Sequence, residues 1–524
     1  MLDKQIEIIK RDFNSSPDIV FRKVKVKNKE ILLVFNSSVS SSSSINDFIL
    51  KKITSIDKRI TRKNIYNHLE NEIPENVIVD IKDKDDLYTK INSGFTVFIF
   101  EKGEPFAIET REDLSRGVSE PLTEQSISGP KDAFTENYQT NLGLIRKRVK
   151  SNHLTIEESV VGKQSKTRVA ILYMDNIVKD DLVKEVNERI SNIDIDAILD
   201  STYIRECIED EHSTFPTIDT TERPDTACIA LLGGRVCVMT ENSPYLLIIP
   251  TFFSDMFHAS EDNYQSHINV TFTRIIRYFA FFIAVLLPAF YIAITTFNHE
   301  TIPVTLLTNF AAQRDGVPFP AIVEALGLTL VFEILRESDI RMPHLSGTAI
   351  SILGAIVLGD AAVSAGIVSP IMVIVISLSA ISSLMFSNVG MVNAIRIWRI
   401  IFMLFATTTG MIGIFLASML LLTTLTSKFS FGKPFLYPLI PLNKKFLKNA
   451  VFKEKIENDN KRMPILTNKN YTRSKLWKRL YYLLFLCFYF VVVVILNLMI
   501  WQWFLLWGLI LKIMNLLLLL KLWI

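Results

Sequence analysis

The hydrophobic positions of the first 270 residues fall in short runs that predict a water-soluble α/β region. Apolar residues over 20–26 and 31–35 flank the polar turn KNKE and predict a β-hairpin. "GFTVFIF" (94–100) and "PFAIET" (105–110) predict a second pair of strands. Over 134–149 the apolar residues recur at intervals of four, four, three and four, which predicts an amphipathic helix that closes a first subdomain.

A second subdomain is predicted from the apolar strand "TRVAILYMD" (167–175) and the helical pattern over 179–192. "TACIALLGG" (226–234), "RVCVMTE" (235–241) and "YLLIIP" (245–250) continue it as further strands, with Gly233-Gly234 as a tight turn between two of them. Strands separated by helices indicate an α/β subdomain.

The pattern changes past Arg274 to long apolar runs that predict an α-helical integral membrane domain. Residues 278–297 form an uncharged run of about the length needed to cross roughly 30 Å of hydrocarbon. Residues 346–386 hold one ionisable side chain, Asp360, and are long enough for two crossings. "GIVSP" supplies the break between them, with Ser369 as the cap of the second helix and Pro370 in its first turn.

Two further apolar stretches complete the membrane domain. Residues 400–425 predict a last span, preceded by Arg396 and Arg399 as anchors in the lipid headgroups. Residues 321–336 carry charges on one helical face and could be an interfacial helix or a span whose charges face protein. We favour an interfacial or re-entrant segment, because four crossings return the chain to the side of the N-terminal region.

Charge separates the chain in the same places. Residues 1–274 carry 35 basic and 44 acidic side chains, a net charge of −9, whereas residues 428–479 carry 14 and 3, a net charge of +11. Positive segments prefer the cytoplasm, and the N-terminus has no secretory signal pattern, so both soluble parts are expected there. The expected domains are 1–150 and 151–274 (cytoplasmic α/β subdomains), 275–427 (membrane domain), 428–479 (basic cytoplasmic tail) and 480–524 (hydrophobic extension).

Motifs of catalysis are missing from the sequence. The four cysteines have no CxxC spacing, the histidines have no HxxxH spacing, and GxGxxG, GxxxxGK and GxSxG do not occur. We therefore expect no enzymatic activity, no metal or other cofactor, and no nucleic-acid partner.

Asp360 is the candidate for chemistry inside the membrane. Small residues form one helical stripe that suits close packing of helices, namely Gly347, Ser351, Gly354, Ala362 and Ala365. Asp360 lies on the opposite side with Ile356, Val363 and Ile367. An ionised carboxylate facing acyl chains costs at least about 2.5 kcal/mol, so this face is expected to meet water, a cation or a protein.

One hypothesis is that Asp360 and its neighbours line a cation path between several copies of the chain. The alternative is that Asp360 caps a short helix or contacts a partner. Glu324 is a second candidate for the path, although a carboxylate near a helix start is also favoured by the helix dipole alone.

Four long motifs carry a resemblance to a known family. They are "SRGVSEPLTEQSISGPKDAFTENYQTNLGLIRKR", "TERPDTACIALLGGRVCVMTENSPYLLIIPTFFSDMFHASEDNY", "PFPAIVEALGLTLVFEILRESDIRMP" and "GTAISILGAIVLGDAAVSAGIVSPIMVIVISLSAIS". Together they resemble the A subunit of the GerA family of spore germination receptors, over roughly residues 25 to 476. Residues 480–524 lie beyond the usual end of the family and are either a further span or the product of a shifted reading frame or a fusion.

The resemblance implies a multi-pass protein of the inner membrane of a bacterial spore that senses nutrients with two partners. These are a transporter-like B subunit and a lipoprotein C subunit. It further implies that several copies assemble into a nutrient-gated ion channel. Two other functions stay open: a membrane-anchored scaffold that clusters receptor subunits without conducting ions, and a transporter that acts alone.

Overall fold

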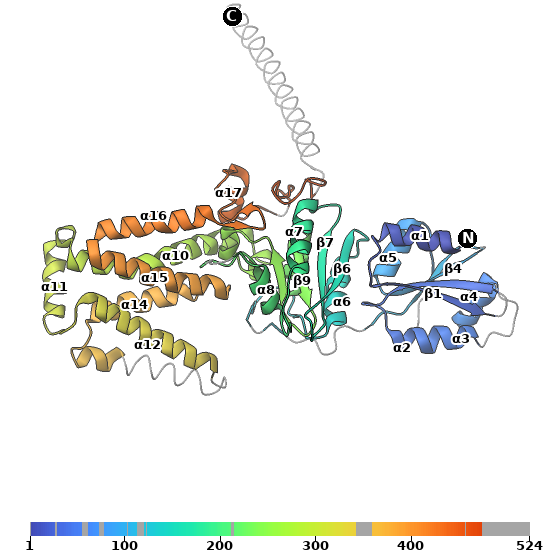
Figure 1. Cartoon of the computed structure of the whole chain (residues 1–524), viewed down its shortest axis with the longest axis horizontal. Coiled ribbons are helices and arrows are strands. Elements are labelled where there is room, and N and C mark those ends of the chain that lie inside the picture. The colour runs from blue at the N-terminus through green and yellow to red at the C-terminus, as the bar shows by residue number, and fades with distance from the viewer. Residues whose placement is uncertain are drawn as a thin grey trace, which may run out of the picture. The chain divides into compact units, whose positions relative to one another are not determined.

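The computed structural model describes residues 2–26, 29–54, 61–72, 78–101, 103–112, 120–121, 123–210, 214–341, 359–455 and 457–473. Within these residues an α/β region is followed by a bundle of helices (Figure 1). The expected class, a two-part α/β region and then a helical domain, is confirmed at this level.

The first subdomain is a five-stranded antiparallel sheet with helices on both faces. Its strand order is β1-β2-β4-β5-β3. Its elements are α1 (Leu2–Asp12), β1 (Ile19–Val26), β2 (Lys29–Asn36), α2 (Ser42–Ser44), η1 (Ile45–Leu50), α3 (Lys51–Thr54), α4 (Arg62–Glu72), β3 (Ile78–Asp80), α5 (Lys84–Asn92), β4 (Phe95–Phe100) and β5 (Phe106–Glu109). Alternate side chains of β2 enter opposite cores: Leu33 packs with α3 and α4, and Leu32 with α1 and α5. Both predicted strand pairs are confirmed.

The second subdomain repeats this topology with the order β6-β7-β9-β10-β8. Its elements are α6 (Tyr138–Arg148), β6 (Leu154–Val161), β7 (Thr167–Met174), α7 (Asp180–Ser191), α8 (Ser201–Ile208), β8 (Asp219–Thr221), α9 (Pro224–Leu232), β9 (Val236–Thr240) and β10 (Leu246–Ile249). Helices α6 and α9 cover one face of the sheet, and α7 and α8 cover the other.

Three predictions in this subdomain are wrong in detail. The apolar segment over 226–232 was expected as a strand but lies in α9, which begins at Pro224. An apolar run without alternation fits a buried helix as well as a buried strand, and the proline at the first position of α9 favours the helix. Gly233 therefore ends a helix rather than joining two strands. Helix α6 starts at Tyr138, where Asn137 caps it, so Phe134 precedes the helix. It was expected to close the first subdomain, but its apolar face packs on the second sheet.

The basic segment after the bundle packs onto the second subdomain. It contains β11 (Phe429–Ser430), β12 (Lys433–Pro434) and α17 (Lys444–Val451). Phe431, Tyr437 and Leu466 are buried in the same core as α7. The Nζ atoms of Lys433 and Lys469 lie 2.7 Å from the carboxylates of Asp181 and Asp180. Residues 428–455 and 462–471 are thus integrated with the α/β region by apolar burial and opposite charge, and are not a free tail.

A second, separate unit comprises Ile456–Lys461 and Thr472–Ile524. Its described residues form one β-bridge between Lys461 and Thr472 and an ion pair between Arg473 and Asp459. The hydrophobic extension expected over 480–524 lies outside the described residues.

The helical bundle is built around α10, which packs against α14, α15 and α16 (Figure 1). The 3-10 turns η2 (Phe253–Phe257) and η3 (Ser260–Asn263) lead into it. Its elements are α10 (His267–Thr296), η4 (His299–Thr301), α11 (Val304–Arg314), α12 (Ala321–Arg341), α14 (Pro370–Ser383), α15 (Val389–Thr409) and α16 (Met411–Ser427). Among the described helices, α10 and α15 are long and apolar enough to cross a membrane, and α14 and α16 are shorter apolar helices.

The expected span over 400–425 is wrong, because the chain reverses at Gly410. This residue joins α15 to α16 with φ 64° and ψ −133°, a conformation open essentially to glycine alone. A window of apolar residues contains both helices and does not reveal the turn. Helix α15 begins at Val389, so Arg396 and Arg399 lie within it rather than before it.

The interpretation of 321–336 as an interfacial or re-entrant segment stays a prediction, and α12 is not among the described helices that are long and apolar enough to cross a membrane. Helix α12 is 21 residues long and packs along α10, α14 and α15. Glu333 lies 3.0 Å from the Nε atom of Arg396 on α15, so its charge faces protein, as in the alternative interpretation. The chain still returns to the α/β region after α16, where the Ser430 hydroxyl donates to the Thr217 carbonyl at 2.7 Å.

Candidate functional site

Asp360 lies in a short helical stretch, 359–364, just before the start of α14. Its side chain is exposed, as are those of Ile367 and Ala365, while Val363 and Ala362 are half-buried. The remaining members of the two predicted faces, Ile356, Gly347, Ser351 and Gly354, lie outside the described residues. The described part of this segment therefore presents both faces to its surroundings within a single chain.

The predicted break before α14 is confirmed. The stretch ends in a turn at Gly366, whose φ is 67°. The Ser369 hydroxyl accepts the backbone N–H of Met372, and Pro370 occupies the first turn of α14. These are the capping serine and the N-terminal proline expected from "GIVSP".

Glu324 is buried and contacts the same helix start. One of its carboxylate oxygens accepts the backbone N–H of Ser369 at 2.9 Å and the Ser369 hydroxyl at 3.0 Å. Its other oxygen lies 3.6 Å from the Nη2 atom of Arg314, at the end of α11. Glu324 thus joins the starts of α12 and α14, as an anion at two helix N-termini. The sequence pointed to the helix dipole but gave no sign of the partner, because 45 residues separate the two.

Arg399 and Arg396, both predicted as headgroup anchors, have different environments. Arg399 is 2% exposed and is hydrogen-bonded within the bundle, so for this residue the prediction is wrong. The Arg396 side chain is one third exposed and pairs with Glu333. Sequence alone places both arginines beside an apolar run and cannot say which one turns inward.

The junction between the α/β region and the bundle centres on Asn388, the cap of α15. Its Oδ1 atom accepts the backbone N–H of Met391 at 3.0 Å, and its Nδ2 atom donates to Asp219 at 2.6 Å. Ten residues further, the Trp398 indole donates to the Thr214 hydroxyl at 3.3 Å. Burial raises the pKa of the Asp219 carboxyl to about 6. Thr214, before β8, and Asp219, the first residue of β8, thus hold the first half of α15 at two points.

Replacing Asn388 by aspartate is expected to separate these two roles. Aspartate caps a helix as well as asparagine does, but it would face the Asp219 carboxylate instead of donating to it. We expect a loss of about 1–3 kcal/mol in the free energy of unfolding of the full chain, measured by chemical denaturation. The exchanged pair Asp219→Asn with Asn388→Asp restores a donor and an acceptor and should recover most of it. Equal losses in the single and the exchanged variants would contradict this contact.

His258 is expected to make stability depend on pH. This residue precedes α10, and its Nε2 atom lies 2.9 Å from the carbonyl of Ala450 on α17. Burial together with the nearby Arg274 lowers the pKa of His258 to about 4. Because the unfolded chain has the ordinary pKa of 6.5, it binds the extra proton first as pH falls. Stability should therefore fall between pH 6.5 and about 4, by at most about 1.4 kcal/mol per pH unit.

Thermal unfolding of the wild type and of His258→Gln across this range measures the effect. Glutamine can still donate to the Ala450 carbonyl but does not titrate. The difference between the two proteins should grow as pH falls below 6.5. A constant difference would contradict the assignment of the titration to His258.

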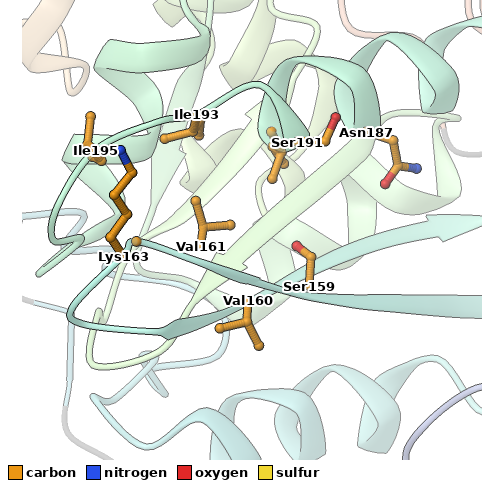
Figure 2. A pocket seen from close by; sticks show the side chains of 10 residues that line it. Ser159, Val160, Val161, Lys163, Asn187, Ser191, Ile193 and Ile195 are labelled. Atoms are coloured by element: carbon orange, nitrogen blue, oxygen red, sulfur yellow. The ribbon is translucent and has the colours of Figure 1, made fainter.

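The second subdomain has an open hollow of about 410 Å³ where the end of β6 meets the end of α7 (Figure 2). Its wall combines Val160, Val161, Ile193 and Ile195 with Ser159 and Asn187. Figure 2 shows Lys163 at the rim beside Ile195. Within the described ranges no group of three or more His, Cys, Asp or Glu side chains could hold a metal ion. The hollow offers mainly apolar contact, and the Lys163 ammonium at its edge pairs with Asp194 at 2.6 Å.

The comparisons with known proteins decide the family. The family model "Bacillus/Clostridium GerA spore germination protein" matches residues 7–465, which include both α/β subdomains and the bundle. The chain belongs to the GerA family. The resemblance to its A subunits is confirmed by the relatives described next.

Two curated relatives of this GerA protein match along most of their length. Spore germination protein KA of Bacillus subtilis (strain 168) is 36% identical over 479 residues, 90% of this chain and 88% of the relative. Spore germination protein GerQA of Bacillus cereus is 32% identical over 457 residues, 86% of this chain and 90% of the relative. A crystal structure of the N-terminal domain of the A subunit of the Bacillus megaterium spore germinant receptor GerK3 is 29% identical. It covers 48% of this chain and 96% of that domain, with a TM-score of 0.39.

Proposed function

We propose that this GerA protein is the A subunit of a nutrient-responsive germination receptor and that several copies form a germinant-gated cation channel in the spore inner membrane. The observation that carries the receptor role is the family match over residues 7–465. The channel role rests on a different observation, the exposed carboxylate of Asp360 within an otherwise apolar stretch.

The outer surface of the bundle supports a membrane location. Large apolar side chains are exposed on α10 and α16, among them Phe279 at 65%, Ile412 at 67% and Phe415 at 62%. Such side chains are stable in lipid and costly in water. The proposal places both α/β subdomains, residues 1–274, in the cytoplasm and 275–427 in the membrane, with 428–473 returning to the cytoplasmic side.

The proposed ion path uses the face of Ile356, Asp360, Val363 and Ile367. An exposed carboxylate attracts cations, and apolar rings on either side of it can close a pore by excluding water. The packing stripe of Gly347, Ser351, Gly354, Ala362 and Ala365 would let neighbouring copies approach closely. Glu324 contributes by holding the start of α14 next to this segment.

The partners in this proposal are a transporter-like B subunit, a lipoprotein C subunit, further copies of the chain and the membrane lipid. Two lysines of the basic segment, Lys433 and Lys469, form ion pairs with Asp181 and Asp180. Lys444, Lys445 and Lys448 on α17 are the basic residues that we propose for contact with anionic headgroups.

Asp360→Asn tests the ion path. The variant keeps size and polarity but removes the charge, so nutrient-triggered cation release from spores should fall by about tenfold or more, whereas Asp360→Glu should retain most of it. The release of a monovalent cation is followed with an ion-selective electrode, with immunoblots to show equal amounts of receptor. Unchanged release in Asp360→Asn would exclude this residue from the path.

The alternative function is a scaffold that clusters receptor subunits without conducting ions. The junction at Asn388 and the apolar surface of the bundle fit this function as well. A receptor that assembles normally but passes no ions with nutrient and partners present would favour the scaffold.

A further inference from the structure

Helix α10 contains a proline, Pro288, in its last third, and this proline leaves one backbone carbonyl without its helical partner. Pro288 has no N–H, so the carbonyl of Ala284, four residues earlier, cannot form the usual helical hydrogen bond. Ala284 and Pro288 are both buried in the bundle. A buried carbonyl without a donor is costly, so another group must supply one.

Two side chains from neighbouring helices supply that donor. The Nε atom of Arg399 on α15 donates to the Ala284 carbonyl at 2.9 Å, and the hydroxyl of Ser379 on α14 donates to it at 2.7 Å. The Nη2 atom of Arg399 also donates to the Ser379 carbonyl at 3.4 Å. Three helices are therefore tied together at the break in α10.

The choice of an arginine for this contact is informative. A neutral side chain could satisfy the carbonyl, whereas a guanidinium buried at 2% exposure must be held by strong acceptors. Hydrogen bonds from a charged donor are stronger than neutral ones, and a carbonyl freed by proline is a strong acceptor site. The contact is thus stable while α10 and α15 are aligned. A shift between these helices is costly, because it leaves the buried guanidinium without its acceptor.

Helix α15 also connects this contact to the α/β region. Asn388, at the start of α15, donates to Asp219, and Trp398, the residue before Arg399, donates to Thr214. At Gly390 a Cβ atom would lie 2.7 Å from Pro216, so the helix and the segment before β8 touch closely. A displacement of that segment must move α15 and with it the guanidinium of Arg399.

We propose that Arg399 is a positioning residue that holds the proline break of α10 in its resting conformation, and that movement of α15 by the second subdomain releases it. This inference rests on the proposed function. When Arg399 moves away, α10 can bend at Pro288, because the helical hydrogen bond from residue 288 to Ala284 is missing there. The proline break is the hinge, Arg399 stabilises its resting conformation, and α15 transmits the movement of the second subdomain to Arg399.

Three variants of the full receptor, examined in spores, test this role of Arg399. Arg399→Met removes the charged one of the two donors and should raise germination without nutrient by about tenfold, the effect of about 1.4 kcal/mol on a two-state equilibrium. Pro288→Ala restores the backbone N–H, removes the hinge and should reduce the response to nutrient by at least about tenfold. The double variant should accumulate like the wild type, because Ala284 again has a helical partner, and should show a low rate both with and without nutrient.

Ser383→Ala is the matched control for Ser379→Ala. Both serines are buried on α14, but the Ser383 hydroxyl donates to Ala380 of its own helix at 2.6 Å. Only Ser379→Ala should raise nutrient-independent germination. If Arg399→Met fails to accumulate, Pro288→Ala decides by itself: an unchanged nutrient response overturns the hinge. Cation release by the wild type, measured in parallel, reports on the proposed channel separately.

Discussion

Replacing Arg146 by methionine is expected to lower the free energy of unfolding of the α/β region by about 3–5 kcal/mol, because it leaves a buried carboxylate without its cation. The Arg146 side chain is fully buried and binds Asp18 through two nitrogens, at 2.8 and 3.1 Å. Arg146 belongs to α6 and Asp18 precedes β1, so the pair fastens the second subdomain to the first. Methionine fills much of the same volume, which limits the loss from packing.

Arg205→Met on α8 is the matched control. The Nε atom of Arg205 lies 4.0 Å from Glu209 and its side chain is one third exposed, so its loss should cost at most about 1 kcal/mol. The free energy of unfolding of both variants is measured by chemical denaturation of the full-length chain, with proteolysis of the soluble region as the readout of unfolding. Equal costs for Arg146 and Arg205 would contradict the structural role of the buried pair.

Replacing Gly410 by valine is expected to lower the free energy of unfolding of the bundle by several kcal/mol and so to prevent it from folding. The backbone conformation at Gly410 strains any residue with a side chain, and a Cβ atom there would lie 2.7 Å from Asn298 and 2.8 Å from Phe297. Because this turn reverses the chain between α15 and α16, its loss also endangers the return of residues 428–473 to the α/β region. We expect almost no receptor in membrane fractions.

Gly327→Ala provides the comparison. Gly327 lies within α12, and a Cβ atom there meets nothing within 4 Å, so the variant should accumulate normally and gain a few tenths of a kcal/mol or more from helix propensity. Immunoblots of membrane fractions compare the two. Normal amounts of Gly410→Val would show that the turn is not needed for this fold.

The soluble half of the fold was predictable where alternation and turns were strong. The hairpin of β1 and β2 and the pair of β4 and β5 follow directly from apolar alternation around polar turns. Helix α9 was not predictable in this way, since its apolar residues are buried on most sides and show neither period clearly. The identical strand order of the two subdomains has no counterpart in a repeated motif that we found in the sequence.

The bundle was harder to predict, because hydrophobicity reports length but not direction. A single glycine in "TTTG" reverses the chain inside what looks like one span, and the sequence does not show that Glu333 on α12 pairs with Arg396 on α15. The position of α12 in the bundle and the turn at Gly410 both depend on tertiary contacts, which hydrophobicity does not report. The expected return of the chain to the α/β region is seen in the hydrogen bond between Ser430 and Thr217.

The candidate site shows the same limit. The capping roles of Ser369 and Pro370 follow from local rules and were predictable. The contacts of Glu324 with Ser369, and of Arg399 with Ala284, join residues 45 and 115 positions apart and depend on tertiary packing. Asp360 was recognisable as unusual because a lone carboxylate in an apolar stretch needs water, a cation or a partner.

Cation flux through the purified receptor, reconstituted with its partner subunits in lipid vesicles, tests the central claim most directly. We predict that nutrient starts a flux of monovalent cations in the wild type, and that Asp360→Asn assembles equally well but conducts about tenfold less or not at all. An assembled wild-type receptor that binds nutrient yet carries no cations would contradict the channel and leave the scaffold as the function.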